Sequence, residues 1–317
     1  MSEIAIVGAG AWGTALAVQA ARAGNDVVLW ARSGADAIEA SRESPRLPGI
    51  LLPEPVRVIG DISLLSGMVI AAVPTQSLRE VLGALTNVRE LVICAKGIEA
   101  GTLRLPLEIA AQVLPDTVAA VLTGPNFAHE IASGQPAAAV VASLDQAMRE
   151  AVMARLATPS FRLYGSDDPV GAQVGGAAKN VIAIAAGAVT GAGLGENARA
   201  ALITRGLAEL ARLTVVLGGR AETVMGLSGL GDLLLTCTGP ASRNFSLGLA
   251  LGRGETLASI LAARRAVTEG VATAPALLAR ARGVDMPICQ AVAGLLDGRT
   301  TLREAIGALL ARPRRDE

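Results

Sequence analysis

The sequence predicts an N-terminal α/β domain built on a doubly wound, mainly parallel sheet, followed by an all-helical domain. In the first half, short β-branched or apolar runs alternate with segments of helical spacing, as in doubly wound sheets. From about Val170 onward these runs disappear, and long Ala/Leu/Gly-rich helical stretches replace them. The length of 317 residues exceeds the ~100–200 typical of one domain. We expect domains at residues 1–172 and 173–317, joined near the turn-rich cluster at 166–169.

The expected strands are short apolar runs bounded by turn or helix signals. Five of them cover residues 4–7, 26–30, 68–73, 91–95 and 118–122, and two further runs at 137–142 and 161–164 extend the same sheet. A helix is expected over residues 14–23, where Gly24-Asn25 stops it. The first strand, this helix and the second strand form one βαβ unit at the start of the chain.

Charge and hydropathy narrow the class of protein. The 28 basic and 28 acidic residues give no net charge, so the chain lacks the electrostatic footprint of a nucleic-acid or anionic-membrane binder. Mean hydropathy is high, at +0.48, yet the most apolar stretch, residues 181–195, is shorter than the ~20 residues of a spanning helix. No signal-peptide pattern opens the chain. We expect a cytoplasmic protein without stable membrane insertion and without a nucleic-acid partner.

The three cysteines do not indicate a metal site. Cys94, Cys237 and Cys289 lack the paired spacing of metal ligands. We interpret them as buried apolar residues and predict no metal.

Lysine is rare in this chain. Only Lys96 and Lys179 among the 28 basic residues are lysine, so arginine supplies positive charge almost everywhere. Lysine differs because its compact ammonium can exchange a proton, whereas a guanidinium stays protonated in proteins. Chance retention at two surface positions is the alternative to a chemical role.

A glycine motif near the N-terminus indicates dinucleotide binding. Gly8-Ala9-Gly10-Ala11-Trp12-Gly13 follows the first expected strand and precedes the first expected helix. In this setting Gly8 permits a tight turn, Gly10 lets the backbone approach a pyrophosphate, and Gly13 allows close helix–strand packing. The first domain is therefore expected to be a Rossmann domain that binds NADP or NAD.

The end of the second strand bears on the choice of cofactor. An NAD site commonly has an acidic residue there for the ribose 2′-hydroxyl, but this chain has Arg32. Arg32 could bind the 2′-phosphate of NADP or be an ordinary exposed arginine. Asp36 is near enough in sequence to keep NAD open.

Other strand ends belong to the same edge of the sheet, where ligands bind in open α/β folds. Lys96 follows one strand, in the position of a substrate or nicotinamide. Residues 123–128 follow another and could offer backbone N–H groups to an anion.

An ordered series of motifs resembles the bacterial NAD(P)-dependent glycerol-3-phosphate dehydrogenases across nearly the whole chain. The matching stretches are residues 8–17, 72–74, 96–99, 124–130, 179–187, 201–209, 229–238, 242–244 and 267–271. The resemblance implies reversible hydride transfer between NAD(P)H and C2 of dihydroxyacetone phosphate, giving sn-glycerol 3-phosphate for phospholipid synthesis. It also implies a possible homodimer.

The resemblance carries residue roles to matching positions. Lys179 corresponds to the proton-transferring residue, and an ammonium there suits the charge that develops on a ketone oxygen. Asp232 corresponds to a substrate-side aspartate, although an Asp before an apolar run is also a good helix-starting residue. The implied substrate-binding residues are Lys96, Gly124, Asn126, Lys179, Asp232, Ser242, Arg243 and Asn244. The implied cofactor contacts are Gly8, Gly10, Ala11, Trp12, Gly13, Arg32, Lys96, Ala128, Arg243, Val267 and Glu269.

Two other functions fit a Rossmann half. A related two-domain 2-ketoacid or β-hydroxyacid reductase would share it, but the Arg243-Asn244 pair favours a phosphorylated substrate. A nucleotide-sensing protein without turnover would be expected to lack part of the set Lys96, Lys179 and Asp232. His129 is the only histidine, and we interpret it as a surface or helix-start residue rather than a general base.

Overall fold

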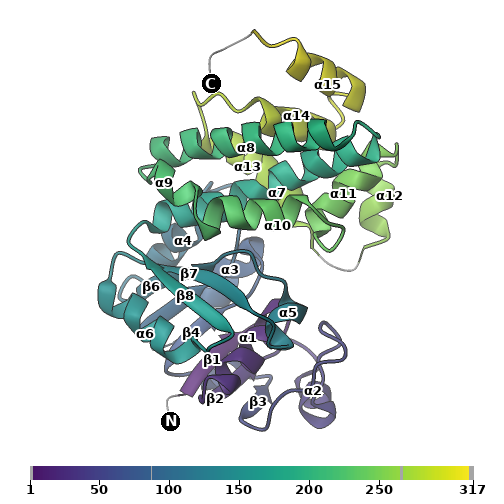
Figure 1. The fold of residues 1–317 in the computed structure, drawn as a ribbon. Helices are drawn as coiled ribbons and strands as arrows, with labels where there is room; N and C mark the ends of the chain where they lie inside the picture. Colours follow the sequence, from purple (N-terminus) through teal and green to yellow (C-terminus); the bar gives the residue numbers. More distant parts are fainter. Residues whose placement is uncertain (1–2, 87, 265–266, 314–317) are drawn as a thin grey trace. The chain divides into compact units, whose positions relative to one another are not determined.

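The structure, a computed structural model, describes residues 3–86, 88–264 and 267–313 (Figure 1). The chain divides into two compact units. The first unit comprises the chain up to residue 96 together with residues 104–173, and the second comprises residues 97–103 and the chain from 174 onward.

An eight-stranded sheet forms the centre of the first unit. Its order is β3-β2-β1-β4-β5-β6-β7-β8, and every neighbouring pair is parallel except β6 and β7. The strands are β1 Glu3–Val7, β2 Asp26–Trp30, β3 Val56–Ile59, β4 Met68–Ala71, β5 Glu90–Ile93, β6 Val118–Thr123, β7 Ala137–Ala142 and β8 Phe161–Ser166. The predicted fold class, a doubly wound and mainly parallel sheet followed by helices, is confirmed.

The sequence prediction missed one strand and misplaced several ends. Strand β3 alternates buried and exposed residues around Arg57, so it lacks the continuous apolar run by which the other strands were recognised. Strands β4 and β5 end two residues before the predicted limits, at Ala71 and Ile93. The first helix begins at Ala11 rather than residue 14, because the motif itself forms the first helical turn.

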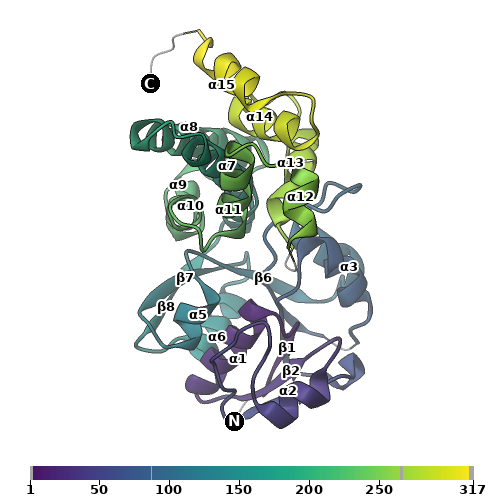
Figure 2. The same ribbon diagram turned by 90° about the vertical axis from the view of Figure 1, so that its right-hand side faces the viewer.

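Helices cover both faces of the sheet. They are α1 Ala11–Arg22, α2 Ala35–Ser41, α3 Thr75–Gly83, α4 Pro106–Val113, α5 Ala128–Ala132 and α6 Gln146–Leu156. Helices α1, α5 and α6 pack together (Figure 2). Helix α3 packs with α4. Right-handed crossovers place these two groups on opposite faces, since the strand order reverses between β1 and β4. The reversal puts the end of β1, and with it the glycine motif, at the position where such folds bind nucleotides.

Helices alone make up the described part of the second unit, apart from short turns. They are α7 Pro169–Gly191, which begins in the first unit, α8 Glu196–Val216, α9 Ala221–Val224, α10 Asp232–Cys237, α11 Arg243–Gly252, α12 Leu257–Ala262, α13 Glu269–Arg280, α14 Pro287–Leu296 and α15 Leu302–Leu310. Residues 226–231 are rich in glycine and contain a π-helical turn at Leu227–Gly231 that leads directly into α10.

Helix α7 is the apolar core helix of this unit. It begins at Pro169, well before the apolar stretch predicted from the sequence, and at 23 residues it is long and apolar enough to cross a membrane by length and composition. Of its most apolar window, however, 89% is buried inside the protein, as in the core helix of a soluble protein. The three cysteines are free and buried, as predicted.

Helices α7 and α11 approach each other so closely that glycine is required at their contact. A Cβ on Gly248 would lie 1.9 Å from the backbone oxygen of Ile184, and a Cβ on Gly252 would lie 2.3 Å from that of Ala188. Both partners advance by four residues together, so the two helices run in parallel. This contact fixes the second half of α11 against the C-terminal part of α7.

Candidate active site

The glycine motif forms a backbone cradle at the start of α1. Gly8 has φ +108°, and a Cβ there would lie 3.0 Å from the backbone oxygen of Ala72. A Cβ on Gly13 would lie 1.9 Å from the oxygen of Gly8. A Cβ on Gly10, by contrast, would meet open space. Gly10 directly precedes α1 and provides no side-chain cap for it. The helix N-terminus is therefore accessible to an anionic group, and the residues present fit a dinucleotide pyrophosphate.

The other predicted cofactor residues of the first unit lie near this edge of the sheet. Trp12 is half-buried in the first turn of α1, near the buried Cys94 thiol. Burial raises the pKa of this thiol to about 12, so it stays neutral. Arg32 is exposed just beyond β2, and Ala128 opens α5.

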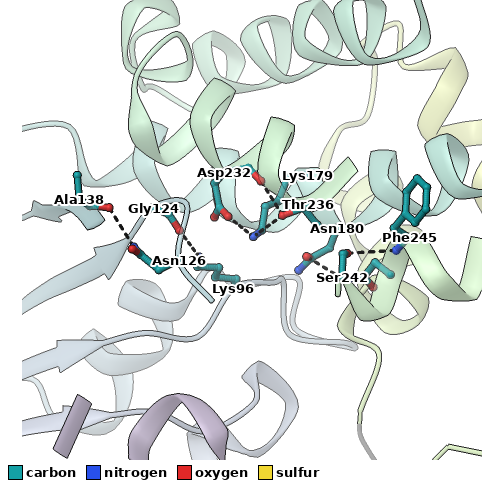
Figure 3. Close-up of polar contacts among 11 residues, drawn as sticks. Lys96, Gly124, Asn126, Ala138, Lys179, Asn180, Asp232, Thr236, Ser242 and Phe245 are labelled. Atoms are coloured by element: carbon teal, nitrogen blue, oxygen red, sulfur yellow. Dashed lines mark hydrogen bonds and ion pairs between the residues drawn. The ribbon is translucent and has the colours of Figure 1, made fainter. Parts of the chain in front are cut away.

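Lys96 lies beyond β5, close to the loop that follows β6. Its Nζ donates to the backbone oxygen of Gly124 over 3.1 Å, and the Asn126 Nδ2 donates to the backbone oxygen of Ala138 over 3.0 Å (Figure 3). Gly124 has φ +144°, and a Cβ there would lie 3.0 Å from Cα of Ala139. The Asn126 Oδ1 is buried without a protein partner. The three predicted substrate residues of this unit are thus neighbours.

Lys179 lies in the interior of the second unit and is held by α10. It is 7% exposed, and its Nζ hydrogen-bonds and pairs with the Asp232 carboxylate (Figure 3). The same Nζ donates to the Thr236 hydroxyl over 3.0 Å, and that hydroxyl donates to the backbone oxygen of Asp232 over 2.6 Å. A buried ammonium is tolerated only when its charge is compensated in this way. The pair therefore holds a charged amine at a fixed position inside the fold.

Ser242 and Arg243 mark the beginning of α11. The Ser242 Oγ accepts the backbone N–H of Phe245 over 3.2 Å and so caps the helix (Figure 3). Arg243 is exposed, and its guanidinium donates to the backbone oxygen of Val267 over 2.8 Å. A positive helix end and a guanidinium stand side by side, an arrangement suited to phosphate.

Asn244 links three segments of the second unit. Its Nδ2 donates to the Asn180 Oδ1 over 2.9 Å, and its Oδ1 accepts the backbone N–H of Gly270 over 3.0 Å. Both asparagines are buried. Glu269, a predicted cofactor contact, is the first residue of α13 and directly precedes Gly270.

Two residues at this site were not singled out from the sequence. Thr236 stands four positions after Asp232 on α10, a spacing that places two residues on one helix face. Asn180 directly follows Lys179, and only its hydrogen bond with Asn244 shows that it belongs to the site. His129 is exposed in the short helix α5, as expected of a surface residue.

Comparison with known proteins connects these residues to a family. The profile of the NAD-dependent glycerol-3-phosphate dehydrogenase N-terminus matches residues 3–149, and that of the C-terminus matches residues 168–307. The chain belongs to the NAD-dependent glycerol-3-phosphate dehydrogenase family. The resemblance predicted from the sequence is confirmed, and so is the class, an NAD(P)-dependent oxidoreductase acting on a CH–OH group.

Individual members of the family match the chain over its length. It is 57% identical to a glycerol-3-phosphate dehydrogenase [NAD(P)+] from Acidiphilium cryptum, covering 99% of this chain and 98% of that protein. It is 52% identical to the protein of the same name from Gluconobacter oxydans, covering 98% and 97%. A crystal structure of glycerol-3-phosphate dehydrogenase from Coxiella burnetii has a TM-score of 0.93 at 37% identity, covering 98% of this chain and 99% of that one.

More distant structures share the fold only. A ketopantoate reductase from Ralstonia eutropha has a TM-score of 0.60 at 18% identity, covering 93% of this chain and 97% of that one. The two-domain architecture therefore extends to reductases of other substrates, and the choice of substrate depends on the residues of the site.

Proposed function

We propose that the chain catalyses reversible hydride transfer between NAD(P)H and C2 of dihydroxyacetone phosphate, giving sn-glycerol 3-phosphate. One observation carries the proposal beyond family membership. In a chain that uses arginine for nearly every positive charge, a buried lysine, Lys179, is held by Asp232 and Thr236. The proposal assigns this amine the proton transfer.

The chemistry required at Lys179 follows from the reaction. A nicotinamide held by these residues would supply or accept the hydride. When C2 of the ketone is reduced, negative charge develops on its oxygen, which the Lys179 ammonium stabilises and then protonates. In the oxidation direction the neutral amine accepts the hydroxyl proton. Asp232 and Thr236 hold Nζ in place, so that no reorganisation is needed during the reaction.

The substrate phosphate is assigned to the start of α11. The helix end supplies partial positive charge, and the Arg243 guanidinium and the Asn244 amide supply N–H donors. Ser242 caps the helix and thereby fixes the direction of its first turn. Lys96, Gly124 and Asn126 are the substrate contacts that we assign to the first unit.

The cofactor residues are assigned in each unit separately. Those of the first unit are Gly8, Gly10, Ala11, Trp12, Gly13, Arg32, Lys96 and Ala128, and those of the second are Arg243, Val267 and Glu269. NADP and NAD are both candidates. The exposed guanidinium of Arg32 favours NADP because it can pair with a 2′-phosphate.

The cellular role follows from the same reaction. We propose a cytoplasmic homodimer that supplies glycerol 3-phosphate for phospholipid synthesis. Burial of the apolar helix α7 supports a location outside the membrane, and the absence of net charge supports a small-molecule substrate rather than nucleic acid.

The deciding experiment is a turnover assay with purified protein, following NADPH and NADH oxidation separately. Dihydroxyacetone phosphate should support turnover, with NADPH used at least as well as NADH. Unphosphorylated 2-keto acids are the matched controls for a related reductase and should be poor substrates. Turnover of a keto acid without turnover of dihydroxyacetone phosphate would refute the proposal, and binding of NADPH without any turnover would point to a nucleotide sensor.

A further inference from the structure

Three helices of the second unit meet at a chain of amide hydrogen bonds. Gly270 in the first turn of α13 donates its backbone N–H to the Asn244 Oδ1, and Asn244 at the start of α11 donates to the Asn180 Oδ1 on α7. Asn180 directly follows Lys179. We propose that Gly270, Asn244 and Asn180 form a positioning relay for the proposed dehydrogenase site, an inference that rests on the proposed function. Gly270 is the residue that sets its direction.

The direction of the relay follows from the chemistry of its members. An asparagine amide can turn over and exchange its oxygen with its nitrogen, but a backbone N–H can only donate. The Gly270 N–H therefore requires the oxygen of Asn244 to face α13. The Asn244 nitrogen must then face Asn180, whose oxygen accepts. One fixed backbone donor thus orients two side-chain amides.

This orientation matters for phosphate binding. The Asn244 Nδ2 carries two N–H groups, and one of them is used by Asn180. With the amide fixed, the second N–H is the donor that we assign to a phosphate oxygen. The reversed amide would present an oxygen acceptor instead, which repels an anion. Gly270 therefore acts on substrate binding through Asn244.

The position of residue 270 demands glycine. A Cβ there would lie 2.7 Å from the Asn244 Oδ1 and 2.8 Å from the backbone oxygen of Asn180. Contacts this short would push α13 away from both asparagines. Helix α13 also depends on the relay, because its N-cap Thr268 makes no side-chain cap bond. Asn244, from another helix, satisfies one of its terminal N–H groups.

The relay also joins residues assigned to the two ligands. Arg243 donates to the oxygen of Val267, while Asn244 accepts from Gly270. Two neighbouring residues of the proposed phosphate site are therefore bonded to both ends of the segment that contains Glu269. Displacement of this segment should therefore weaken the binding of substrate and of cofactor together.

The test is a pair of double-mutant cycles read in KM, kcat and NADPH affinity. In the first, Gly270→Ala and Asn244→Ala are made singly and together. Each single change should lower kcat/KM for dihydroxyacetone phosphate by about ten- to hundredfold, mainly through KM. The double variant should be close to Asn244→Ala alone. Losses that multiply would overturn the relay, because Gly270 would then act independently of Asn244.

Gly307→Ala is the matched control, because a Cβ at this exposed position of α15 meets open space. It should leave kinetics and melting temperature near wild type. The second cycle, Asn180→Leu with Asn244→Ala, needs no change at the glycine and applies even if Gly270→Ala does not fold. The losses in kcat/KM from these two changes should likewise not multiply in the double variant, and losses that do multiply would overturn the relay.

A binding measurement separates failure of the relay from failure of the proposed function. Inorganic phosphate is titrated into wild type and Asn180→Leu in the presence of NADPH, followed by calorimetry. Weaker binding to the variant supports the relay even if dihydroxyacetone phosphate is not turned over. If wild type turns over dihydroxyacetone phosphate but wild type and Asn180→Leu bind inorganic phosphate equally well, the relay is contradicted and the proposed function stands.

Discussion

The surroundings of the two lysines differ in a way that separates holding a charge from moving a proton. Lys96 is half-buried and donates to a backbone carbonyl, that of Gly124. Lys179 is buried and is bound by a carboxylate and a hydroxyl from one helix face. A carbonyl fixes one N–H direction, whereas Asp232 and Thr236 compensate the charge and orient the amine. We therefore assign proton transfer to Lys179 and a binding role to Lys96.

The largest effect is expected for Lys179→Arg. Arginine keeps the positive charge, but a guanidinium does not release a proton in the working pH range. Loss of general acid–base catalysis should lower kcat by about 10²–10⁴-fold. Steady-state kinetics with dihydroxyacetone phosphate measures this, and NADPH fluorescence should report nearly unchanged cofactor affinity. Near wild-type kcat would leave Lys179 with an electrostatic role only.

Asp232→Asn should have the next largest effect. Asparagine keeps an oxygen for the Lys179 Nζ but removes the compensating charge. Hydrogen bonds to charged groups contribute about 1.5–3 kcal/mol, so kcat should fall by about ten- to a hundredfold. Thr236→Val, which removes the neutral partner and keeps the shape, is the comparison and should lose less. Equal losses would mean that the charge of Asp232 is not what distinguishes this lysine.

Lys96→Arg should be milder than either change. The guanidinium still supplies positive charge near Gly124, so the expected loss is below about tenfold, and it should be in KM rather than kcat, as for uniform binding. The test is to measure kcat and KM of this variant and of Lys179→Arg under the same conditions. If kcat fell more in Lys96→Arg, the two assignments would have to be exchanged.

The smallest kinetic effect is expected for substitution of Glu209, because this buried residue is assigned a structural role only. Its carboxylate on α8 accepts the backbone N–H groups of Ile288 and Cys289 at the start of α14. Burial raises the pKa of Glu209, against the opposing effect of these bonds. The folded state thus binds its proton more tightly than the unfolded chain, so stability contributed by this group increases as pH falls toward its unfolded pKa.

Glu209→Gln removes this titration. The free energy of unfolding of wild type, measured by urea, should rise relative to that of the variant as pH falls from 7 to about 4.5, near the ordinary value for glutamate. The kcat of the variant should stay within about twofold of wild type, because a substitution at a structural residue outside the assigned site changes the stability of the fold rather than catalysis. A free energy of unfolding of wild type that falls relative to that of the variant as the pH is lowered would contradict the direction of the Glu209 pKa shift.

The first unit was the easier one to predict from sequence. Most of its strands are apolar runs that reveal themselves locally, and the glycine motif is contiguous, so both fold and cofactor loop could be recognised. Strand β3 escaped because Arg57 faces solvent in its middle. Its place in the sheet depends on pairing with β2, a contact between distant residues.

The site of the second unit could not be assembled from local patterns. Lys179 stood out by composition, and Asp232 only by family resemblance. The importance of Gly270 is invisible in sequence, because it arises from the parallel contact of α7 and α11 and from the start of α13. Such contacts join residues far apart in the chain, and no spacing rule for a single helix reports them.

Chemical rescue of Lys179→Ala tests the central assignment most directly. Ethylammonium and guanidinium carry the same charge, but ethylammonium, like lysine, is the stronger acid and can transfer its proton to a developing alkoxide, whereas guanidinium, like arginine, holds its proton. With dihydroxyacetone phosphate and NADPH, added ethylammonium should raise the residual kcat at least about tenfold, part of the general-acid contribution, and guanidinium should not. Equal rescue by guanidinium would show that Lys179 supplies only charge, contrary to the account.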